Sequence, residues 1–428
     1  MRAYLILQRG RARPIEFWVW ASLLGLLLGA SGAASPLYRV YQAEWHFSAT
    51  TLTAVFAVYA LALLITLLLA GSLSDYLGRR PVIAVALALD AAATMLFLAA
   101  HGVGLLFAAR ALQGIAVGAT AGALSAALIE RQPAGTQLGP VVGSAAPIFG
   151  LGAGALASSA LIQYGPAPTQ LVWWLLLAAF VLGIAATLAL SEPGTRRPGA
   201  LGSLRSRVAV PRAVRGTFAA AVPCLVATWA LSGLYLSLGP SLAAVLFGSQ
   251  NRLWGGLVIG LLTASGGTAA ILLRNSRPTS AMVTGCLLLL LGVGVTFGAI
   301  ATTRTAAFLA GTAVAGAGFG AAFLGAFRTL VALAAPGERA GLIASVYVVS
   351  YLAFSVPALI AGVVVSQAGL RDTALVYAAA VAMLSAVAAA SFLFRRAYRP
   401  PGQPSVQAEV APQARCRGPA AERPQPPR

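Results

Sequence analysis

The stretch Gly71-Ser72-Leu73-Ser74-Asp75-Tyr76-Leu77-Gly78-Arg79-Arg80-Pro81 joins two long apolar runs of this chain. The run before it begins near Thr51, and the run after it begins at Pro81. About 20 apolar residues are enough for a helix to cross the hydrocarbon core of a bilayer. The stretch is therefore typical of a short charged connection between two membrane-spanning helices.

Composition extends this interpretation to the whole chain. The 428 residues are 59% hydrophobic and only 9% charged, whereas a soluble domain is about 25% charged. Only helices and closed barrels satisfy their backbone in lipid, and the apolar runs are too long and continuous for barrel strands. We expect an all-α polytopic membrane protein with twelve transmembrane helices. The spans begin near Phe17, Thr51, Pro81, Val103, Leu138, Thr169, Val214, Trp254, Ala281, Thr305, Gly341 and Thr373.

Arginine placement predicts the orientation. Arginines precede the first span and follow every even-numbered span, while the alternate connections hold only Arg39, Arg252, Arg304 and Arg371. The positive-inside rule then places both termini in the cytoplasm and the chain in the cytoplasmic (inner) membrane. A net charge of +19 could indicate a nucleic-acid partner. The basic residues are spread over alternate connections, however, so we expect contact with the lipid bilayer and no nucleic acid.

The chain divides near its middle. Residues 191–213 are rich in Pro, Gly and Arg and are expected to form a cytoplasmic linker between a first six-helix bundle, 1–190, and a second, 214–396. Residues 397–428 are rich in Pro, Gln and Arg without apolar periodicity, which is typical of a disordered tail.

Weak internal symmetry relates the two bundles. Gly114 and Gly118 in the fourth span recur as Gly316 and Gly320 in the tenth. Such repeats are typical of transporters in which two bundles enclose a central cavity. The second copy has Thr312 where the first has an arginine, so we expect the coupling chemistry in the first half.

Two motifs resemble the major facilitator superfamily. The opening stretch resembles the family loop G-x-L-x-D-x-x-G-R-R-x between helices 2 and 3, with matches at Gly71, Leu73, Asp75, Gly78, Arg79 and Arg80. Arg110-Ala111-Leu112-Gln113-Gly114 resembles the family's second motif, R-x-x-Q-G. The resemblance is closest to the bacterial drug/proton antiporter-like members. It implies a secondary transporter that works by alternating access, and not an enzyme.

In the family the first motif latches the two halves together in the outward-facing state. For this chain the resemblance implies that Asp75 approaches the 339–342 region. Gly71 and Gly78 would permit a tight turn. In the alternative interpretation, Arg79 and Arg80 only determine topology.

Charged residues inside the spans are candidates for coupling. Arg110 lies roughly 12 Å into its span at 1.5 Å per residue, where a permanent charge is costly unless it is paired or hydrated. With Gln113 it would face the central cavity, while Gly114 would allow close helix packing. Asp90 is the acidic residue well inside a span. It could carry a proton, or it could remain protonated in an interhelical contact, because the family's usual carriers lie on helices 1 and 4.

The remaining candidates are a hinge and a cavity. Gly143, Pro147, Gly150 and Gly154 loosely resemble the Gly/Pro-rich helix-5 motif of drug antiporters, and would supply a hinge or simply close packing. Candidate cavity aromatics, each also suited to plain packing, are Tyr38, Trp229, Tyr235, Tyr347 and Tyr351.

The sequence thus favours proton-coupled export of a small, partly apolar compound by a monomer. The alternative is uptake or uniport of a small metabolite such as a sugar or organic acid. A membrane-embedded enzyme or a non-transporting receptor is disfavoured. With two His and three Cys at unsuitable spacings, we expect no metal site and no cofactor beyond the proton gradient.

Overall fold

The computed structural model describes residues 14–194, 208–335 and 337–397, and within them the chain is helical. Eleven of the described helices are long and apolar enough to cross a membrane. They are α2 (Pro14–Trp45), α3 (Ala49–Ala70), α5 (Arg79–Leu98), α6 (Val103–Arg131), α7 (Leu138–Tyr164), α8 (Leu171–Ala189), α9 (Arg215–Ser237), α11 (Leu253–Leu272), α12 (Pro278–Thr302), α13 (Thr305–Leu333) and α14 (Arg339–Ala397). Shorter elements are α4 (Ser74–Leu77), η2 (Arg212–Val214) and α10 (Gly239–Phe247).

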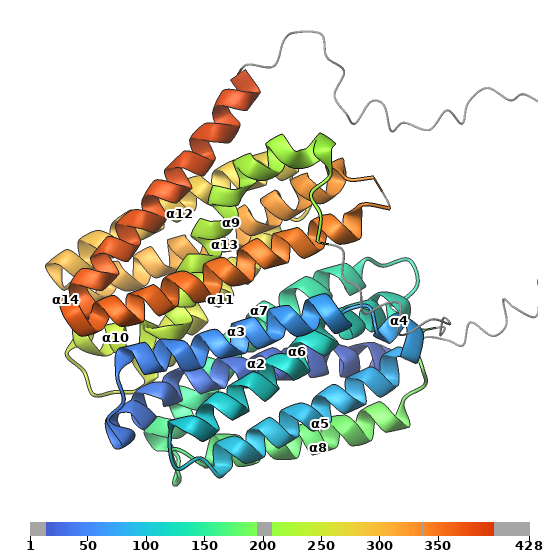
Figure 1. The fold of residues 1–428 in the computed structure, drawn as a ribbon, viewed down its shortest axis with the longest axis horizontal. Coiled ribbons are helices and arrows are strands. Elements are labelled where there is room, and N and C mark those ends of the chain that lie inside the picture. The colour runs from blue at the N-terminus through green and yellow to red at the C-terminus, as the bar shows by residue number, and fades with distance from the viewer. Residues whose placement is uncertain (1–13, 195–207, 336, 398–428) are drawn as a thin grey trace, which may run out of the picture.

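The last long element contains two spans. Gly369 interrupts α14 with φ 81° and ψ 163°, a backbone conformation that glycine adopts without a Cβ penalty. The chain reverses direction there, at the left edge of Figure 1. The prediction of a twelve-helix membrane protein is therefore confirmed, and the spans begin close to the predicted positions.

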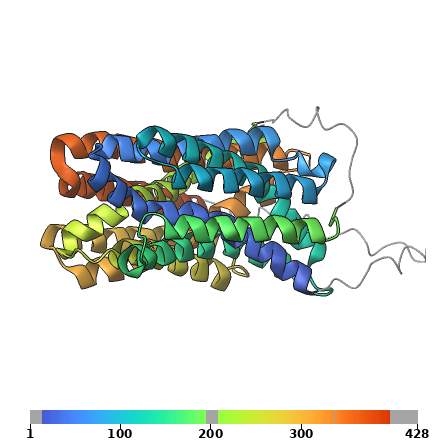
Figure 2. The ribbon, with the colours of Figure 1, turned by 90° about the horizontal axis from the view of Figure 1, so that it is seen from below.

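The helices form two groups that lie side by side (Figure 1). We call α2–α8 the N-half and α9–α14 the C-half. Extensive contacts between the halves are made by α3 with α14 and by α7 with α11. The long helices run along a common direction in both views (Figure 2). Of the predicted linker and tail, residues 195–207 and 398–428 lie outside the described part of the chain.

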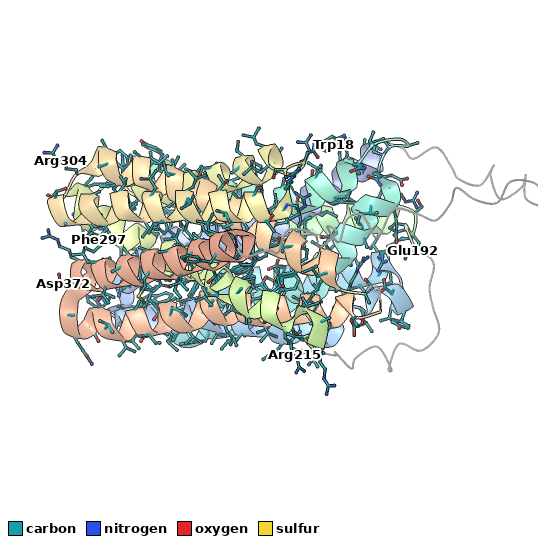
Figure 3. All side chains as sticks on the ribbon, turned by 90° about the horizontal axis from the view of Figure 1, so that it is seen from above. Trp18, Glu192, Arg215, Phe297, Arg304 and Asp372 are labelled. Carbon is teal, nitrogen blue, oxygen red and sulfur yellow. The ribbon has the colours of Figure 1, made fainter. Side chains whose placement is uncertain are left out.

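The bundle has two distinct ends. Figure 3 shows Arg304 and Asp372 at one end and Glu192 and Arg215 at the other. We call the first the Arg39 end, because α2 brings that residue there, and the second the Asp75 end, where α4 lies (Figure 1).

Two hydrogen bonds join the halves near the Arg39 end. The Thr50 hydroxyl donates to the carbonyl of Gly362 at 3.1 Å, and the backbone N–H of Arg252 donates to Oε1 of Gln163 at 2.9 Å. The first bond connects α3 to α14. The second connects Arg252, which precedes α11, to α7. The Arg39 end is thus where the halves are tied together in this conformation.

Candidate functional site

Close helix packing places Arg110 deep inside the N-half. Its side chain is only 1% exposed. On the same helix, a Cβ at Gly114 would clash with the carbonyl oxygen of Tyr59, and one at Gly118 would lie 2.9 Å from Cβ of Thr66. Small residues at such positions let two helix backbones approach closely. The glycines of α6 therefore bring Arg110 against the α3 surface that carries Tyr59.

The guanidinium group of Arg110 is held mainly by neutral groups. Its central carbon lies 4.0 Å from the ring centroid of Tyr59 and 5.8 Å from that of Tyr38, both within cation–π range. It donates to Oε1 of Gln113 at 2.5 Å and approaches the carbonyl of Ser31 at 3.5 Å. Within the described ranges, the ion pairs involve other arginines. A buried cation without a direct counter-ion is costly to maintain.

Asp90 lies next to this cation. It is fully buried on α5, and neither of its carboxyl oxygens accepts or donates a hydrogen bond to any residue of the described chain. Its carboxyl group nevertheless interacts electrostatically with Gln113 and Arg110. The structure therefore brings together three residues singled out from sequence: a cation, an amide and an acid. Asp90 faces the interior of the N-half rather than its periphery.

An aromatic cluster occupies the C-half. We define it as Trp229, Phe323, Phe327, Tyr347, Tyr351 and Phe354. The Trp229 ring centroid lies 4.9 Å from that of Tyr351 and 5.4 Å from that of Phe323. Tyr347 is 6.2 Å from Tyr351. Both tyrosines and Trp229 keep partial exposure, so the cluster presents ring surface suited to an apolar or aromatic solute.

Half of this cluster escaped the sequence analysis. Phe323 and Phe327 were not singled out, although they are spaced i, i+4 on α13, as Tyr347 and Tyr351 are on α14. Residues four apart share one face of a helix. Two facing aromatic pairs with this spacing are the signal that could have revealed the cluster.

Helix α3 connects the two sites. Its Phe56 packs on Phe354 with ring centroids 4.7 Å apart, and its Tyr59 lies close enough to Tyr351 for their hydroxyl groups to interact electrostatically. The same Tyr59 ring covers Arg110. The polar site of the N-half and the aromatic cluster of the C-half thus meet across a single helix.

Tyr235 differs from Trp229, Tyr347 and Tyr351 because, like Tyr38, it is almost completely buried. It is 4% exposed, its hydroxyl shares a 2.9 Å hydrogen bond with Thr312, and its ring stacks on Phe308 at 6.3 Å. The pair joins α9 to α13 within the C-half. It corresponds to the neighbouring pair of Tyr38 and Arg110 in the N-half, which fits the symmetry seen in the sequence.

Helix α7 packs through small residues on both sides. Toward α2, Cβ atoms at Gly150 and Gly154 would clash with backbone atoms of Gly25 and Gly29. Toward α11, small residues meet again, with Gly152 against Thr263. By contrast, a Cβ at Gly143 would meet only the side chain of Leu128, at 3.9 Å. Close packing thus explains Gly150 and Gly154, and leaves Gly143 with Pro147, inside α7, as the candidate hinge positions.

The latch motif forms a network within the N-half. Its second glycine, Gly78, has φ 103°, but Gly71 is right-handed helical at φ −59°. Of the two glycines, Gly78 therefore has the positive φ that favours glycine, whereas Gly71 lies in a right-handed turn between α3 and α4. Arg79 pairs with Asp75 and, at 3.2 Å, with Glu130.

An acidic residue missed in the sequence completes the network. Glu192 accepts hydrogen bonds from the backbone N–H groups of Arg79, at 2.7 Å, and Arg80. A carboxylate at this position satisfies the free donors at the start of α5 and complements the helix dipole. Arg80 also donates to the carbonyl of Leu188. The sequence signal for Glu192 was the position of this residue just after the sixth span, beside the Arg-rich linker.

The expected partner of the latch is engaged elsewhere. Arg339 at the start of α14 donates to the carbonyl of Ala334 at 3.2 Å, while Asp75 pairs with Arg79. Each group therefore has a partner in its own half. In this conformation the latch contact between Asp75 and the 339–342 region is not among the interactions of the described residues, and the halves are joined at the opposite end.

Comparison with known proteins agrees with this architecture. The family model described as Major Facilitator Superfamily matches residues 20–275. The crystal structure of the nucleoside transporter NupG superposes with a TM-score of 0.68 at 14% identity, covering 88% of this chain and 99% of that one. The human organic anion transporter MFSD10 (TETRAN) gives 0.60 at 17% identity, covering 86% and 98%. No curated protein matches in sequence. With a family model matching more than half of its length and two six-helix groups in that arrangement, the chain belongs to the Major Facilitator Superfamily.

Proposed function

We propose that this membrane transporter is a proton-coupled exporter of a small, partly apolar compound. The observation that carries the proposal is the buried series Arg110, Gln113 and Asp90. The carboxyl group of Asp90 is buried away from water and lies beside a permanently charged guanidinium group. In such surroundings a change in a neighbouring charge can change whether the carboxyl group is protonated. Protonation of Asp90 would remove the negative charge that acts on Arg110 and on the neighbouring amide of Gln113.

The aromatic cluster supplies the substrate side of the proposal. Trp229, Tyr347 and Tyr351 offer ring faces and hydroxyl groups on one side of the interface between the halves, and Arg110 lies behind Tyr59 on the other. A solute with an apolar or aromatic body would bind the rings. Its arrival would displace α3 relative to the aromatic cluster, and this offers a physical route from binding to the buried charges.

We infer the orientation from charge. The described part of the Asp75 end carries many arginines, among them Arg79, Arg131 and Arg277, whereas the Arg39 end carries four. The positive-inside rule then places the Asp75 end in the cytoplasm of a bacterial inner membrane. Because the halves are joined at the Arg39 end, the described conformation would be the inward-facing one. Closure of the Asp75 latch would accompany the outward-facing state, with α7 bending at Gly143 and Pro147. We propose a monomer as the working unit.

The test is proton flux in inverted membrane vesicles that contain this protein. The lumen is first acidified by respiration, and a panel of cationic, neutral and anionic drugs is then added while lumenal pH is followed with a fluorescent dye. Vesicles with Arg110→Ala and vesicles without the protein are the controls. A compound that collapses the gradient only with the intact protein would support antiport and identify the substrate class.

If no compound of the panel collapses the pH gradient, the proposal of proton-coupled drug export is overturned. A complementary assay then measures uptake of radiolabelled nucleosides, sugars and organic acids into right-side-out vesicles. Uptake that dissipates the gradient would indicate a symporter, and uptake independent of the gradient would indicate a uniporter. Both outcomes replace the export proposal with the import of a metabolite.

A further inference from the structure

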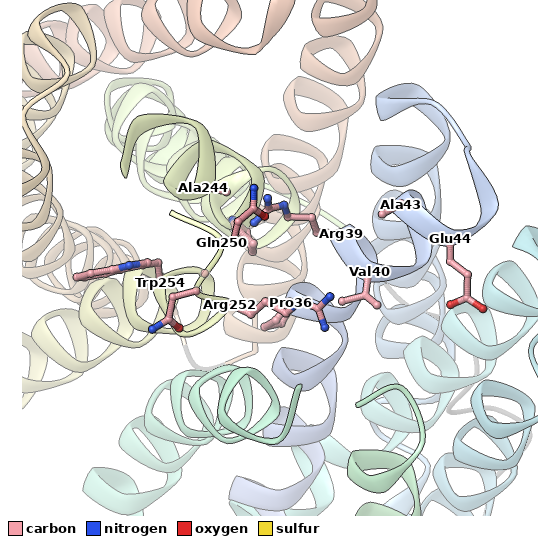
Figure 4. Close-up of a pocket in the computed structure, with 12 residues that line it drawn as sticks. Pro36, Arg39, Val40, Ala43, Glu44, Ala244, Gln250, Arg252 and Trp254 are labelled. Carbon is pink, nitrogen blue, oxygen red and sulfur yellow. The ribbon is translucent and has the colours of Figure 1, made fainter. Parts of the chain in front are cut away.

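A cavity of about 370 Å³ lies between the halves at the Arg39 end. Helix α2 supplies one wall, and α10 with the start of α11 supplies the other (Figure 4). The lining side chains that matter here are Arg39, Glu44, Gln250, Arg252 and Trp254. This volume falls in the range of small-molecule sites, and it is separate from Arg110 and from the aromatic cluster.

Two arginines, one from each half, face this cavity. Figure 4 shows the guanidinium groups of Arg39 and Arg252 extending into the space between the halves, with Glu44 set to one side. The two cations are close enough for their charges to repel. Neither guanidinium group takes part in an ion pair or a hydrogen bond with another described residue. With Glu44 as the acidic side chain of the lining, the two convergent arginines leave a net positive charge where the halves meet.

Other features of the cavity also favour an anion. The N-terminus of α11, a 20-residue helix that begins at Leu253, lies at the cavity. The backbone N–H groups of Arg252 and Leu253 already donate to Gln163 and Asn251, so this end of the helix contributes the positive end of its dipole and no free donors. Gln250 and Asn251 bring amide groups to the lining. Trp254 adds an indole face, fixed by edge-on packing against Phe247 at 5.0 Å. The cavity therefore combines charge for an anionic group with a rigid apolar wall.

We propose that this cavity binds a small soluble anion with a carboxylate or phosphate group and an aromatic or apolar body, and that the bound anion holds the two halves together at the Arg39 end. Arginine forks donate paired hydrogen bonds to such groups. Because one arginine belongs to each half, a single anion would replace repulsion with attraction across the interface. A ligand that binds only the joined arrangement shifts the population toward it.

The first experiment measures binding of benzoate to the purified full-length protein by isothermal titration calorimetry, with neutral benzamide as the matched control. We expect benzoate to bind and benzamide not to bind at the same concentrations. Arg39→Gln and Arg252→Gln should each weaken benzoate binding by about tenfold or more, since each removes a charge-assisted hydrogen bond. Arg304→Gln, at the same end but outside the cavity, should leave binding unchanged. Glu44→Gln should strengthen it.

The source of the anion is distinguished by repeating the titration in nanodiscs. Equal benzoate affinity in phosphatidylcholine and phosphatidylglycerol discs would support a soluble anion. Competition confined to phosphatidylglycerol discs would overturn that choice and assign the cavity to a lipid phosphate. Absence of benzoate binding in detergent and in both kinds of disc, or equal binding by the Arg39→Gln/Arg252→Gln double variant, would overturn the site itself. Thermal unfolding of each variant checks that it is folded.

A second measurement tests the effect on the halves. Spin labels on His101→Cys and Thr302→Cys, in a background without native cysteines, report the separation of the N-half and the C-half at the Arg39 end. Benzoate should shift the distance distribution toward its short component, and the double arginine variant should lose this shift. Benzoate binding without any change in the distribution would overturn the joining role. None of these readouts requires transport, so they stand or fall separately from the proposed export.

Discussion

The guanidinium carbon of Arg110 lies 4.0 Å from the ring centroid of Tyr59, so the π face of a residue on the neighbouring helix is a main partner of this buried cation. A neutral partner stabilises the charge without cancelling it. The remaining field reaches Asp90.

Replacement of the aromatic ring should destabilise the fold. Tyr59→Leu removes both the cation–π contact and part of the core, and should cost about 1–3 kcal/mol. Tyr59→Phe keeps the ring and should cost less. The measurement is thermal unfolding of the purified variants in the same detergent. A Tyr59→Leu protein as stable as Tyr59→Phe would show that the ring does not support the cation.

Neutralisation of the buried acid should separate exchange from coupling. Asp90→Asn preserves shape but cannot release a proton, so substrate-driven proton flux should fall to the level of empty vesicles. Counterflow, which exchanges substrate without a net proton movement, should persist. Both assays use the substrate identified in the vesicle panel, with Thr94→Val, one turn along α5, as the matched control. Normal proton flux by Asp90→Asn would exclude this residue as the carrier.

Two glycines of α7 should respond in opposite ways to a larger side chain. Gly154→Leu would drive a side chain into the backbone of Gly29, so we expect loss of monodisperse protein. Gly143→Ala has open space and should be tolerated, with a change only in transport rate if this position bends. Fluorescence-detected size-exclusion chromatography compares the two. Equal behaviour would contradict the packing described for α7.

The latch motif makes a functional prediction that stability measurements alone would miss. Asp75→Asn should reduce transport by about tenfold or more while insertion in the membrane remains normal, because it removes the charge that would engage the start of α14 in the other conformation. Membrane yield and transport are measured on the same preparation. Undiminished transport by the Asp75→Asn protein would exclude the latch.

A conservative change in the C-half should have a small structural effect. Thr312→Val keeps the side-chain shape but leaves the Tyr235 hydroxyl without its partner, at a cost of about 1 kcal/mol. Thermal unfolding should show a slight loss, and transport should be unchanged because Tyr235 packs within the C-half. A strong transport defect would place this pair in the substrate path.

The spans could be predicted because a bilayer imposes a length on every apolar run, and the breaks between runs carry charge or glycine. Close packing of α6 against another helix was also predictable, since Gly114 and Gly118 allow a second backbone to approach. The identity of that helix, α3, was not predictable. The ring of Tyr59 over Arg110 depends on the relative rotation of two helices, and sequence spacing along one helix does not determine it.

The same limit explains the other surprises. Tyr38 and Tyr235 occupy similar places in their own halves, yet only tertiary packing directs one toward a buried cation and the other toward Thr312. The break between α9 and α10 at Leu238 lies inside an apolar stretch, where Gly239-Pro240 is the local signal, but that dipeptide does not specify whether the helix bends or breaks. Arg39 and Arg252 are far apart in sequence and were noted only for topology, because their convergence requires the two halves to be placed side by side.

The single-residue reversal at Gly369 has a practical consequence for anyone modifying this protein. Spans eleven and twelve are joined without a loop, and the corner is bound to α12 by a hydrogen bond from Arg371 to the carbonyl of Ala301 at 2.6 Å. An epitope tag or reporter inserted there would have to break helical structure on both sides. The connections around His101 and Thr303 are exposed, and they are the better sites for attaching a label at this end of the bundle.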